Sequence, residues 1–460
     1  MARDNTRQSV LFPELFDKPA AVQFDQPEAT SDGGAVLLAQ LDKKLGLSRA
    51  LSDCLCDYRD PRKVVHSYEE LIRQRVFGIA CGYEDCNDVA RLSRDGLFPT
   101  LCGRKPNQDE GLASQPTLSR FENAMNGAEC LKAASQMAEI VFDRHRRRIG
   151  KNKVKKITID FDGAVDRTHG MQQLSLFSGF YQSWCYFPLF CAVSFNDEAT
   201  QYVFGAVLRS GRATEAVASQ AILNRVIPRL KTLFPKAKIL VRLDAGYKGP
   251  ELLQLLERHR VKYVIGLAGN AVLTRLSRTQ MREAKRLSKG AEETVTVYGE
   301  TQYCAKSWKR RKRRVVSKCQ IVQLKGMSPR ENRRFVVTNL ATRPKSVFKT
   351  YAGRGDFENR IKELKEGLHI DRTSCTNFAA NQFRLLLTLA AYILFQEIHL
   401  RLAHTELSRT QLWILRDRIL KIGGTVVRST RRFVIRLAES HPWVDVWIRL
   451  ARSCGATSIA

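Results

Sequence analysis

The spacing of apolar and polar residues changes several times along the chain, and each change marks a predicted boundary. Residues 1–33 carry three prolines among residues of mixed polarity and predict an irregular arm. Residues 34–155 show apolar positions at helical spacing in several stretches, the longest being YEELIRQRVFGIACG. We therefore predict a helical N-terminal domain. Its segment Pro116 to Asn123 is either a DNA-recognition helix or an ordinary capped helix.

From Lys156 the apolar period changes to two, which predicts a strand with acids on one face. Two more strand-like stretches follow, YFPLFCAVSF and QYVFGAVL. A helix over about residues 214–234 then precedes a strand at 238–243. A second helix at 250–259 precedes a strand at 263–266. The order βββαβαβ over residues 156–267 predicts an α/β domain that mixes antiparallel and parallel strand pairs.

The α/β pattern stops after residue 267. Residues 268–345 are rich in strand-forming residues and predict a β-rich insertion with a basic edge, because Lys306 to Lys318 holds eight basic residues and no acid. Residues 346–402 predict two helices that complete the α/β domain. The second contains the apolar stretch Leu385 to Phe395, which is too short to span a bilayer and predicts a buried helix. Residues 403–460 predict a basic helical C-terminal region.

The charge of the chain points to a polyanionic partner. Lysine and arginine exceed aspartate and glutamate by 76 to 46, which gives a net charge of +30. A large excess of lysine and arginine favours binding to nucleic acid, because these residues neutralise phosphates and release the condensed counterions. Association with ribosomes or unspecific basicity are the alternative explanations of the same composition. The twelve cysteines form no paired zinc spacing, and no apolar signal segment opens the chain. We expect reduced thiols and a soluble, cytoplasmic protein that does not enter a membrane.

Three acids lie at positions where α/β folds usually bind their ligands. Asp162 ends the first strand, Asp244 ends a later strand, and Glu358 lies on the helix after the insertion. The carboxyl ends of strands form the ligand-binding edge of an open sheet. Three carboxylates that meet there repel one another unless a cation neutralises them, and Mg²⁺ prefers such oxygen ligands. Two ions can serve an in-line phosphoryl displacement. Asp160 is a rival for the first acid.

The segment YAGRGDFENRIKELKEG, which contains Glu358, also carries an aromatic residue and cations that could bind phosphate. On one continuous helix, Tyr351, Arg354 and Lys365 share a narrow arc with Glu358, which suits contact with phosphate. The apolar positions form a separate stripe that would seat the helix on a core; they are Phe357, Ile361, Leu364 and Leu368. Asp356 and Glu363 are predicted to point into solvent. The alternative is a surface helix in which Arg354 and Glu358 only pair with each other.

Together these motifs resemble the DDE transposases of bacterial insertion sequences. The resemblance rests on Asp162-Gly-Ala-Val, on Asp244-Ala-Gly-Tyr, on the β insertion and on the spacing Y-x2-R-x3-E-x6-K, and it covers about residues 156–400. It implies a ribonuclease H-like catalytic core. It also implies that Asp162, Asp244 and Glu358 ligate Mg²⁺ or Mn²⁺, with two ions expected, while the Tyr, Arg and Lys of the signature grip DNA phosphates.

The chain departs from the family pattern at one position of the first motif. Relatives with Asp-Gly-Thr have a hydroxyl where this chain has Ala164, which keeps Asp160 open as the first acid. In hairpin-forming relatives a tryptophan of the insertion accepts a flipped base. Trp308, followed by Lys309, Arg310 and Arg311, is the matching candidate for DNA binding here, with packing inside the insertion as the alternative.

The function implied is DNA transposition. The protein would bind double-stranded DNA at terminal inverted repeats, free a 3′-OH at each end, and join that 3′-OH to target DNA. Two ends must be joined, so a homodimer is expected in the DNA complex, associated with the bacterial nucleoid. A metal-dependent nuclease without strand transfer, or a DNA-binding regulator on an inactive transposase fold, are the alternatives.

Overall fold

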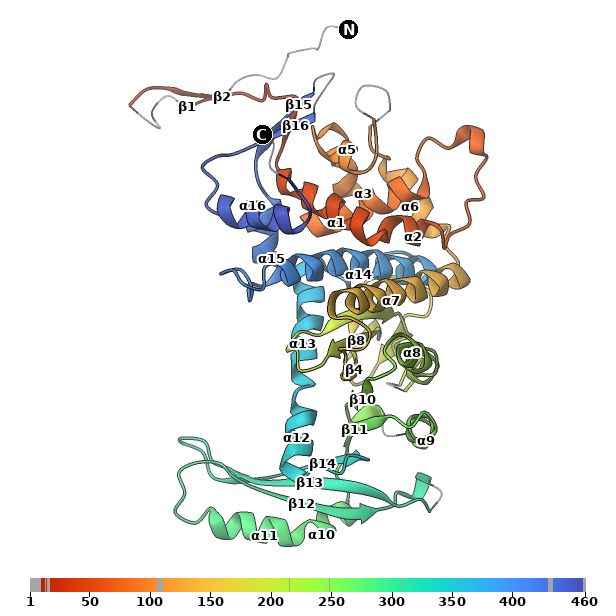
Figure 1. The fold of residues 1–460 in the computed structure, drawn as a ribbon, viewed down its shortest axis with the longest axis vertical. Coiled ribbons are helices and arrows are strands. Elements are labelled where there is room, and N and C mark those ends of the chain that lie inside the picture. Colours follow the sequence, from red (N-terminus) through yellow and green to blue (C-terminus); the bar gives the residue numbers. More distant parts are fainter. Residues whose placement is uncertain are drawn as a thin grey trace. The chain divides into compact units, whose positions relative to one another are not determined.

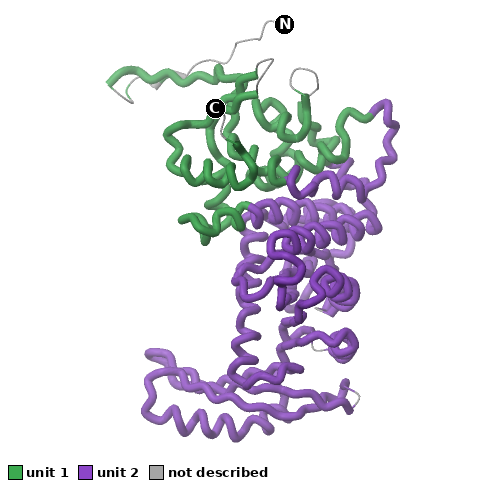
Figure 2. Tube along the Cα trace, in the orientation of Figure 1, with its two compact units in different colours: residues 1–41, 64–118, 398–460 green, residues 42–63, 119–397 purple. Residues whose placement is uncertain are grey.

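The computed structural model describes residues 10–12, 14, 17–105, 111–214, 216–247, 249–308, 310–428 and 433–457. Its contacts divide the chain into two compact units, shown in different colours in Figure 2. Unit 1 comprises residues 1–41, 64–118 and 398–460, and unit 2 comprises residues 42–63 and 119–397. Unit 1 thus joins N-terminal and C-terminal segments, which the sequence pattern alone had placed in separate domains.

The helices of the N-terminal region form as their sequence patterns predict. In α3, for example, the Ser67 side chain accepts from the backbone N–H of Glu70, the Glu70 side chain accepts from the backbone N–H of Ser67, and Gly82 ends the helix in the left-handed conformation. The described helices up to residue 149 are α1 (Val36–Leu45), α2 (Leu47–Ser52), α3 (Tyr68–Cys81), α4 (Cys86–Ala90), α5 (Phe98–Leu101), α6 (Gln115–Asn123) and α7 (Gly127–Ile149).

The C-terminal region is not wholly helical, contrary to the prediction. After α15 (Leu412–Leu415), strands β15 (Gly424–Arg428) and β16 (Phe433–Leu437) pair antiparallel, and β15 also pairs with β3 (Ala29–Thr30). Valine, isoleucine and threonine in these strands favour extended backbone, and the basic residues between them hid that pattern. The region ends in α16 (Val444–Ser453), while β1 (Val10–Phe12) and β2 (Ala20–Val22) form a separate pair.

Unit 2 is built on one mixed sheet of eight strands. Their order is β12-β13-β14-β11-β10-β4-β8-β9, in which β10 runs parallel to both β4 and β11 and the other neighbours are antiparallel. The predicted βββαβαβ order is confirmed by β4 (Lys156–Gly163), β8 (Leu189–Phe195), β9 (Tyr202–Val207), α8 (Ser219–Leu233), β10 (Lys238–Leu243), α9 (Pro250–Arg258) and β11 (Lys262–Leu267).

The insertion is β-rich, as predicted, and it extends this same sheet. Its strand β14 (Arg330–Thr338) pairs with β11, and β13 (Arg313–Val322) and β12 (Val295–Tyr303) follow outward. Helices α10 (Ala271–Leu276) and α11 (Arg278–Leu287) precede these strands. The chain between β4 and β8 forms a small separate sheet that the pattern did not predict; its strands are β5 (Asp166–Arg167), β6 (Leu176–Ser178) and β7 (Ser183–Tyr186).

Helices cover both sides of the large sheet. In Figure 1, α12 (Pro344–Ala352) and α13 (Gly355–Lys362) lie on one side of the strands, and α8 and α9 lie on the other. A π-helical turn, Glu363–Gly367, follows α13. Helix α14 (Phe378–Arg401) is long and apolar enough to cross a membrane, but 83% of its apolar window is buried inside the protein. The predicted buried helix is therefore confirmed, and it is longer than the apolar stretch suggested.

Candidate active site

Two aspartates two residues apart on β4 have different surroundings. The side chain of Asp160 is fully buried and accepts two hydrogen bonds from Arg242, from Nε at 2.8 Å and from Nη2 at 2.7 Å. Gln201 donates a third at 2.8 Å. Burial raises the pKa of Asp160, and the bonds from Arg242 oppose that rise. Asp160 is thus engaged in a buried ion pair with Arg242 and in a bond with Gln201. This favours Asp162 as the first acid of the site.

Asp162 lies at the rim, with 14% of its side chain exposed. Its Oδ1 accepts from the backbone N–H of Gly163 at 3.0 Å, and its Oδ2 accepts from Arg354 Nη1 at 2.7 Å. Burial raises the pKa of Asp162 to about 6; Arg354 lowers it, and the negative charge of Asp244 raises it further. Asp162 and Asp244 are therefore near enough to repel each other.

Asp244 is held in the turn that follows β10. Its Oδ1 accepts from the backbone N–H of Gly246 at 2.8 Å. Gly266 on β11 leaves room for this turn, because a Cβ there would lie 2.6 Å from Tyr351 Oη and 2.7 Å from Ala245 N. A side chain at position 266 would displace either group. The missing Cβ thus lets the hydroxyl of Tyr351 and the Asp244 turn approach the same point of the sheet.

The segment that carries Glu358 is broken, whereas the sequence predicted one continuous helix. α12 ends at Ala352 and α13 begins at Gly355. At the break, a Cβ on Gly353 would lie 2.3 Å from Arg242 Nη1, and the same nitrogen donates to Thr350 O at 3.1 Å. The guanidinium that pairs with Asp160 therefore also fixes the end of α12. Arg242 was missed by sequence reasoning, although a cation between the apolar residues Val241 and Leu243 near the end of the strand was a usable signal.

The break and the π-helical turn shift the faces expected from a straight helix. The apolar stripe is buried as predicted, with Phe357 and Leu364 fully inaccessible. Asp356 is exposed, also as predicted. The prediction for Glu363 is wrong: the residue is buried, and its Oε2 accepts from Tyr392 Oη at 2.7 Å and from Arg360 Nη1 at 2.9 Å. The partner on α14 draws Glu363 into the interior, which a helical wheel does not show.

Arg354 joins two of the three predicted ligands. Its Nη1 donates to Asp162, and its Nη2 donates to Glu358 Oε1 at 2.9 Å. The Glu358 side chain is 62% exposed, while that of Arg354 is only 15% exposed. Burial acts to lower the pKa of Arg354, but the charge of Asp162 raises it above its ordinary value, so the guanidinium stays charged. The helical Arg354–Glu358 pair exists, and it belongs to a larger cluster.

Lys365 reaches back to the first acid motif rather than out to solvent. Its Nζ donates to Val165 O at 2.9 Å and forms an ion pair with Asp371 at 3.2 Å. Asp166, next along the chain, is fully buried and accepts from Thr373 Oγ1 at 2.9 Å. Burial raises the pKa of Asp166 to about 8, with a smaller rise from Asp371 against lowering by Thr373, Lys365 and Arg384. The phosphate contact of Lys365 stays a prediction.

The acids suit a divalent metal by their chemistry. Among the described residues no three His, Cys, Asp or Glu side chains converge as a ready metal site. Instead the guanidinium of Arg354 stands between Asp162 and Glu358, with Asp244 in electrostatic range of both Asp162 and the arginine. A cation is thus already held by hard carboxylate oxygens, the donors that Mg²⁺ and Mn²⁺ prefer. The set fits the metal once Arg354 gives up these oxygens.

The insertion residues predicted to bind DNA differ in their exposure. Trp308 is buried at 2% exposure, packs edge-on against Tyr303 at 5.5 Å, and lies under the guanidinium of Arg313 at 5.1 Å. Arg310 is exposed, and Arg311 is paired with Glu257 at 3.1 Å. Lys309 lies outside the described residues. The buried indole favours the packing alternative, and base stacking on it would require the ring to leave this position.

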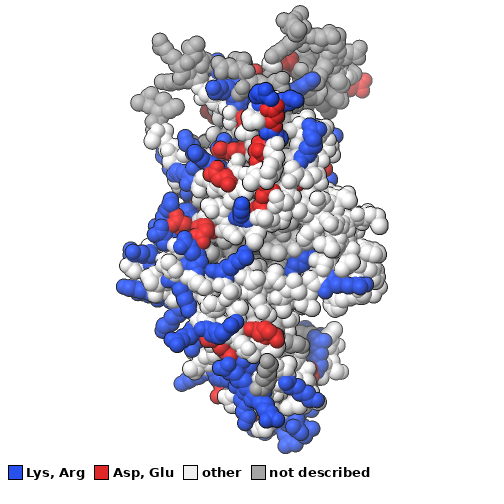
Figure 3. Space-filling view, turned by 90° about the vertical axis from the view of Figure 1, so that its right-hand side faces the viewer, with Lys and Arg blue, Asp and Glu red and all other residues white. Residues whose placement is uncertain are grey.

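Basic side chains cover far more of the face shown in Figure 3 than acidic ones do. A regular series lies on α11 and just beyond it, where four exposed cations recur at helical spacing: Arg278, Arg282, Lys285 and Lys289. The opposite side of this helix is buried through Met281 and Ala284. One edge of the insertion therefore presents a cationic stripe, although Lys285 is engaged with Glu331.

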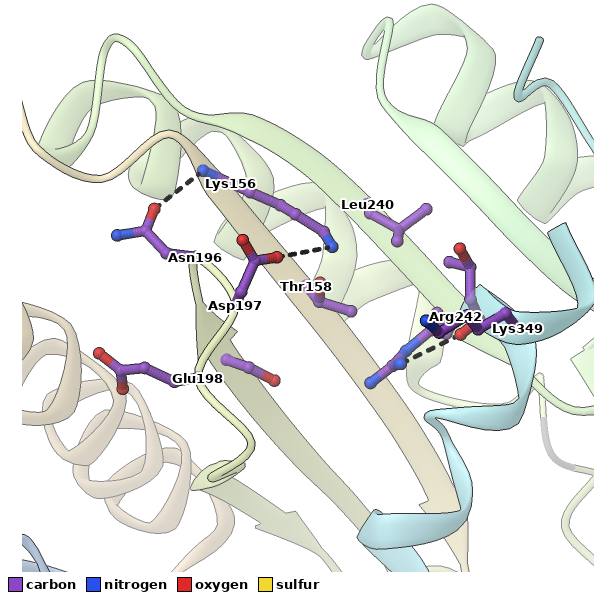
Figure 4. A pocket seen from close by; sticks show the side chains of 10 residues that line it. Lys156, Thr158, Asn196, Asp197, Glu198, Leu240, Arg242 and Lys349 are labelled. Carbon is purple, nitrogen blue, oxygen red and sulfur yellow. Dashed lines mark hydrogen bonds and ion pairs between the residues drawn. The ribbon is translucent and has the colours of Figure 1, made fainter. Parts of the chain in front are cut away.

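A polar pocket of about 270 Å³ lies on the same sheet, away from the three acids (Figure 4). Its walls come from β4, β10, the end of β8 and α12. They mix both signs of charge, with Lys156 near Asp197 at 3.7 Å and Arg242 bonded to Thr350 O. Three cations and two acids line the pocket, none of the three predicted acids is among them, and the acid cluster remains the better candidate for chemistry.

The comparisons with known proteins decide the family. Residues 12–455 match the family model described as transposase DDE domain group 1. The chain belongs to this transposase family. Its general activity is therefore DNA transposition; the DDE family implies nuclease and transesterase activity, and its members generally use divalent metal ions. The predicted family resemblance is confirmed at this level.

Similarity beyond the family model is distant. The cryo-EM structure of a piggyBac transposase synaptic complex with hairpin DNA shares 8% identity with this chain, with a TM-score of 0.41 over 84% of this chain and 79% of that one. No curated protein matches the chain.

Proposed function

We propose that this transposase cuts double-stranded DNA at the ends of an insertion sequence and joins the freed 3′-OH to target DNA, with Asp162, Asp244 and Glu358 as its catalytic acids. The observation that carries the proposal is the Arg354 bridge. It joins an acid at the end of β4 to an acid on α13, and a third acid, at the end of β10, interacts electrostatically with Asp162 and Arg354. These three elements are far apart in sequence, and the fold makes their charges interact.

The strand order supports a ribonuclease H-like core. Strands β9-β8-β4-β10-β11 lie in that spatial order, with β8 antiparallel to β4 and with β4, β10 and β11 parallel. The first and fourth strands of the core, β4 and β10, are neighbours, so the acids at their carboxyl ends lie side by side. The insertion between β11 and α12 adds strands to the far edge of the sheet and leaves these two ends uncovered by its own strands.

Asp162, Asp244 and Glu358 would hold the metal, and two ions are expected. Bound Mg²⁺ or Mn²⁺ would activate an attacking water or 3′-OH and stabilise charge on the phosphate. The role of Arg354 follows from its contacts. Its two η-nitrogens hold one oxygen of Asp162 and one of Glu358, and the same fork matches two oxygens of a phosphate. We infer that Arg354 exchanges the carboxylates for a DNA phosphate when the site is filled.

The remaining cations supply affinity for DNA. Tyr351 and Lys365 flank Arg354 and would contact phosphates near the cut, and Arg310, Arg311 and the α11 stripe would follow the backbone farther out. The helical N-terminal segments would read the terminal inverted repeats. Two ends must be processed together, so we propose a homodimer in the DNA complex, acting at the nucleoid in the cytoplasm.

The test is a plasmid that carries the inverted repeats flanking the gene. We expect nicks at both repeat ends in Mg²⁺ but none in EDTA, followed by joined products when a target plasmid is added. Cleavage without joining would leave a nuclease that does not transfer strands. Specific end binding without any cleavage, in Mg²⁺ and in Mn²⁺, would indicate a regulator on an inactive fold.

A further inference from the structure

The small sheet between the first acid and β8 exposes an unusual number of aromatic rings. Phe177, Phe180 and Trp184 are 39%, 86% and 57% exposed, and Tyr181 lies among them in sequence. Phe177 and Trp184 are cross-strand partners on β6 and β7, with ring centroids 6.2 Å apart. Folded proteins rarely leave several large rings in solvent together unless they meet a ligand or partner.

A chain of ring contacts connects this hairpin with the acid site. Phe187 presses on Gly163, the residue after Asp162, so closely that a Cβ on Gly163 would lie 2.6 Å from the ring. Tyr181 packs against Phe187 with centroids 6.0 Å apart, and Phe180 meets Tyr181 edge-on at 4.8 Å. Two ring–ring contacts and one contact between a ring and Gly163 therefore connect the exposed Phe180 with the residue that follows the first acid.

The charges around the hairpin are complementary to DNA. No aspartate or glutamate occurs from Arg167 to Asn196, a stretch that includes the whole hairpin. Arg167 on β5 is exposed, and the exposed Arg212 donates from Nε to Phe177 O at 3.3 Å. A surface that combines stacking rings with cations is the usual platform for unpaired nucleotides, since every base has a face to stack and every nucleotide has a phosphate.

We propose that the hairpin Leu176–Tyr186 binds unpaired bases of the DNA strand that leaves the acid site, with Phe180 and Trp184 as the stacking rings. This inference rests on the proposed function, since it names where the cleaved strand goes. A second copy of the chain is the other conceivable occupant. The exposed surface area of three rings is well below the roughly 800 Å² that each partner buries in a stable interface, so the rings alone do not support a dimer contact.

The test measures binding by fluorescence anisotropy in EDTA, so that no cleavage is needed. The probes are an oligo-dT strand and a blunt duplex of equal length. The double variant Phe180→Ala and Trp184→Ala should raise the Kd for the single strand by about 5- to 100-fold, the range expected for lost base stacking, and change the duplex Kd by less than about twofold. Tyr58→Ala is the matched control, because Tyr58 is 82% exposed in the same unit but is no part of the hairpin.

The single variant Phe180→Leu separates stacking from apolar contact. Leucine keeps much of the apolar surface but has no aromatic face, so it should weaken single-strand binding nearly as much as alanine does. An unchanged single-strand Kd in the double variant, or equal losses for strand and duplex, would overturn the proposal. So would a shift from dimer to monomer in the double variant with DNA binding intact, because that result assigns the rings to a second copy.

A fluorescent base gives an independent reading. With 2-aminopurine in the oligo-dT strand, stacking on the wild type should quench its emission, and the double variant should not. Equal quenching by both would contradict the proposal. The proposed function fails separately: if variants of the acids cut as well as the wild type, the catalytic assignment is lost, whatever the hairpin binds. If those variants are inactive while the hairpin variants bind normally, only the present inference is lost.

Discussion

Two ion pairs on one strand face show how the same residue types serve different purposes. Asp160 and Arg242 are neighbours across β4 and β10; the side chain of Asp160 is fully buried, that of Arg242 is 11% exposed, and Gln201 is a third partner. Asp162 lies two residues further along β4, at the rim, and pairs with Arg354. Arg354 also pairs with the exposed Glu358. The first pair is closed, whereas the second is connected to a carboxylate that can meet a ligand.

Only one of the two pairs can exchange a partner for a ligand. A buried, fully bonded pair cannot give up a partner without leaving an uncompensated charge in the interior. A pair at the rim can, because water, metal or phosphate can replace the lost partner. We therefore propose that Asp160 stabilises the fold and that Asp162 serves catalysis, and four experiments test this proposal.

The largest effect is expected for the rim acid. Asp162→Asn should lower the rate of end cleavage by about a thousandfold or more, because loss of a metal ligand removes several kcal/mol of transition-state stabilisation. Specific DNA binding should persist in a gel-shift assay. Normal cleavage by Asp162→Asn, with Asp160→Asn inactive but folded, would reverse the assignment of the two acids.

The second experiment addresses the buried pair. Asp160→Ala should destabilise unit 2 by about 3 to 5 kcal/mol in urea unfolding, because Arg242 would stay buried without its carboxylate. Asp162→Ala is the matched control and should cost clearly less, since its arginine can turn to Glu358 or to water. The double variant Asp160→Ala with Arg242→Met should recover part of the loss. Equal costs for the two single alanine variants would remove the distinction between the pairs.

The third experiment uses Asp166, a buried acid that bonds to a threonine rather than to an arginine. Its pKa of about 8 keeps it protonated in the folded protein, whereas the unfolded chain releases the proton near about pH 4. Wild-type stability should therefore fall as pH rises through this range. Asp166→Asn should gain about 2 kcal/mol on the wild type between pH 6 and pH 8, measured by urea unfolding at each pH. A constant difference across that range would show that Asp166 is ionised when folded.

The smallest effect concerns the bridging cation. Arg354→Ala should weaken binding of all DNA sequences and lower the slope of log Kd against log salt by about one unit, as expected for one lost phosphate contact. Lys365→Ala should behave alike if it also leaves its backbone partner for phosphate. An unchanged slope for Arg354→Ala would mean that the arginine serves only to hold Asp162 and Glu358.

Much of this protein was readable from local pattern. The alternation from Lys156 identified the strand and the face of its acids, and the order βββαβαβ anticipated the mixed sheet, because strand and helix periods depend on neighbouring residues. The spacing of the Tyr, Arg, Glu and Lys signature pointed to the family. The apolar stripe of α13 and the burial of α14 also followed from composition and period alone.

The tertiary structure decided what those patterns left open, since a period tells which face a side chain takes but not what it meets. Asp160 and Asp162 share a face of β4, and distant partners distinguish them. Asp160 pairs with Arg242, 82 residues away, in the interior, whereas Asp162 pairs with Arg354, 192 residues away, at the rim, where a ligand can reach it. Arg242 also donates to Thr350 O beside Gly353, where α12 ends, and Tyr392 buries Glu363. Each is a contact between distant segments, formed by packing, and no local spacing encodes it.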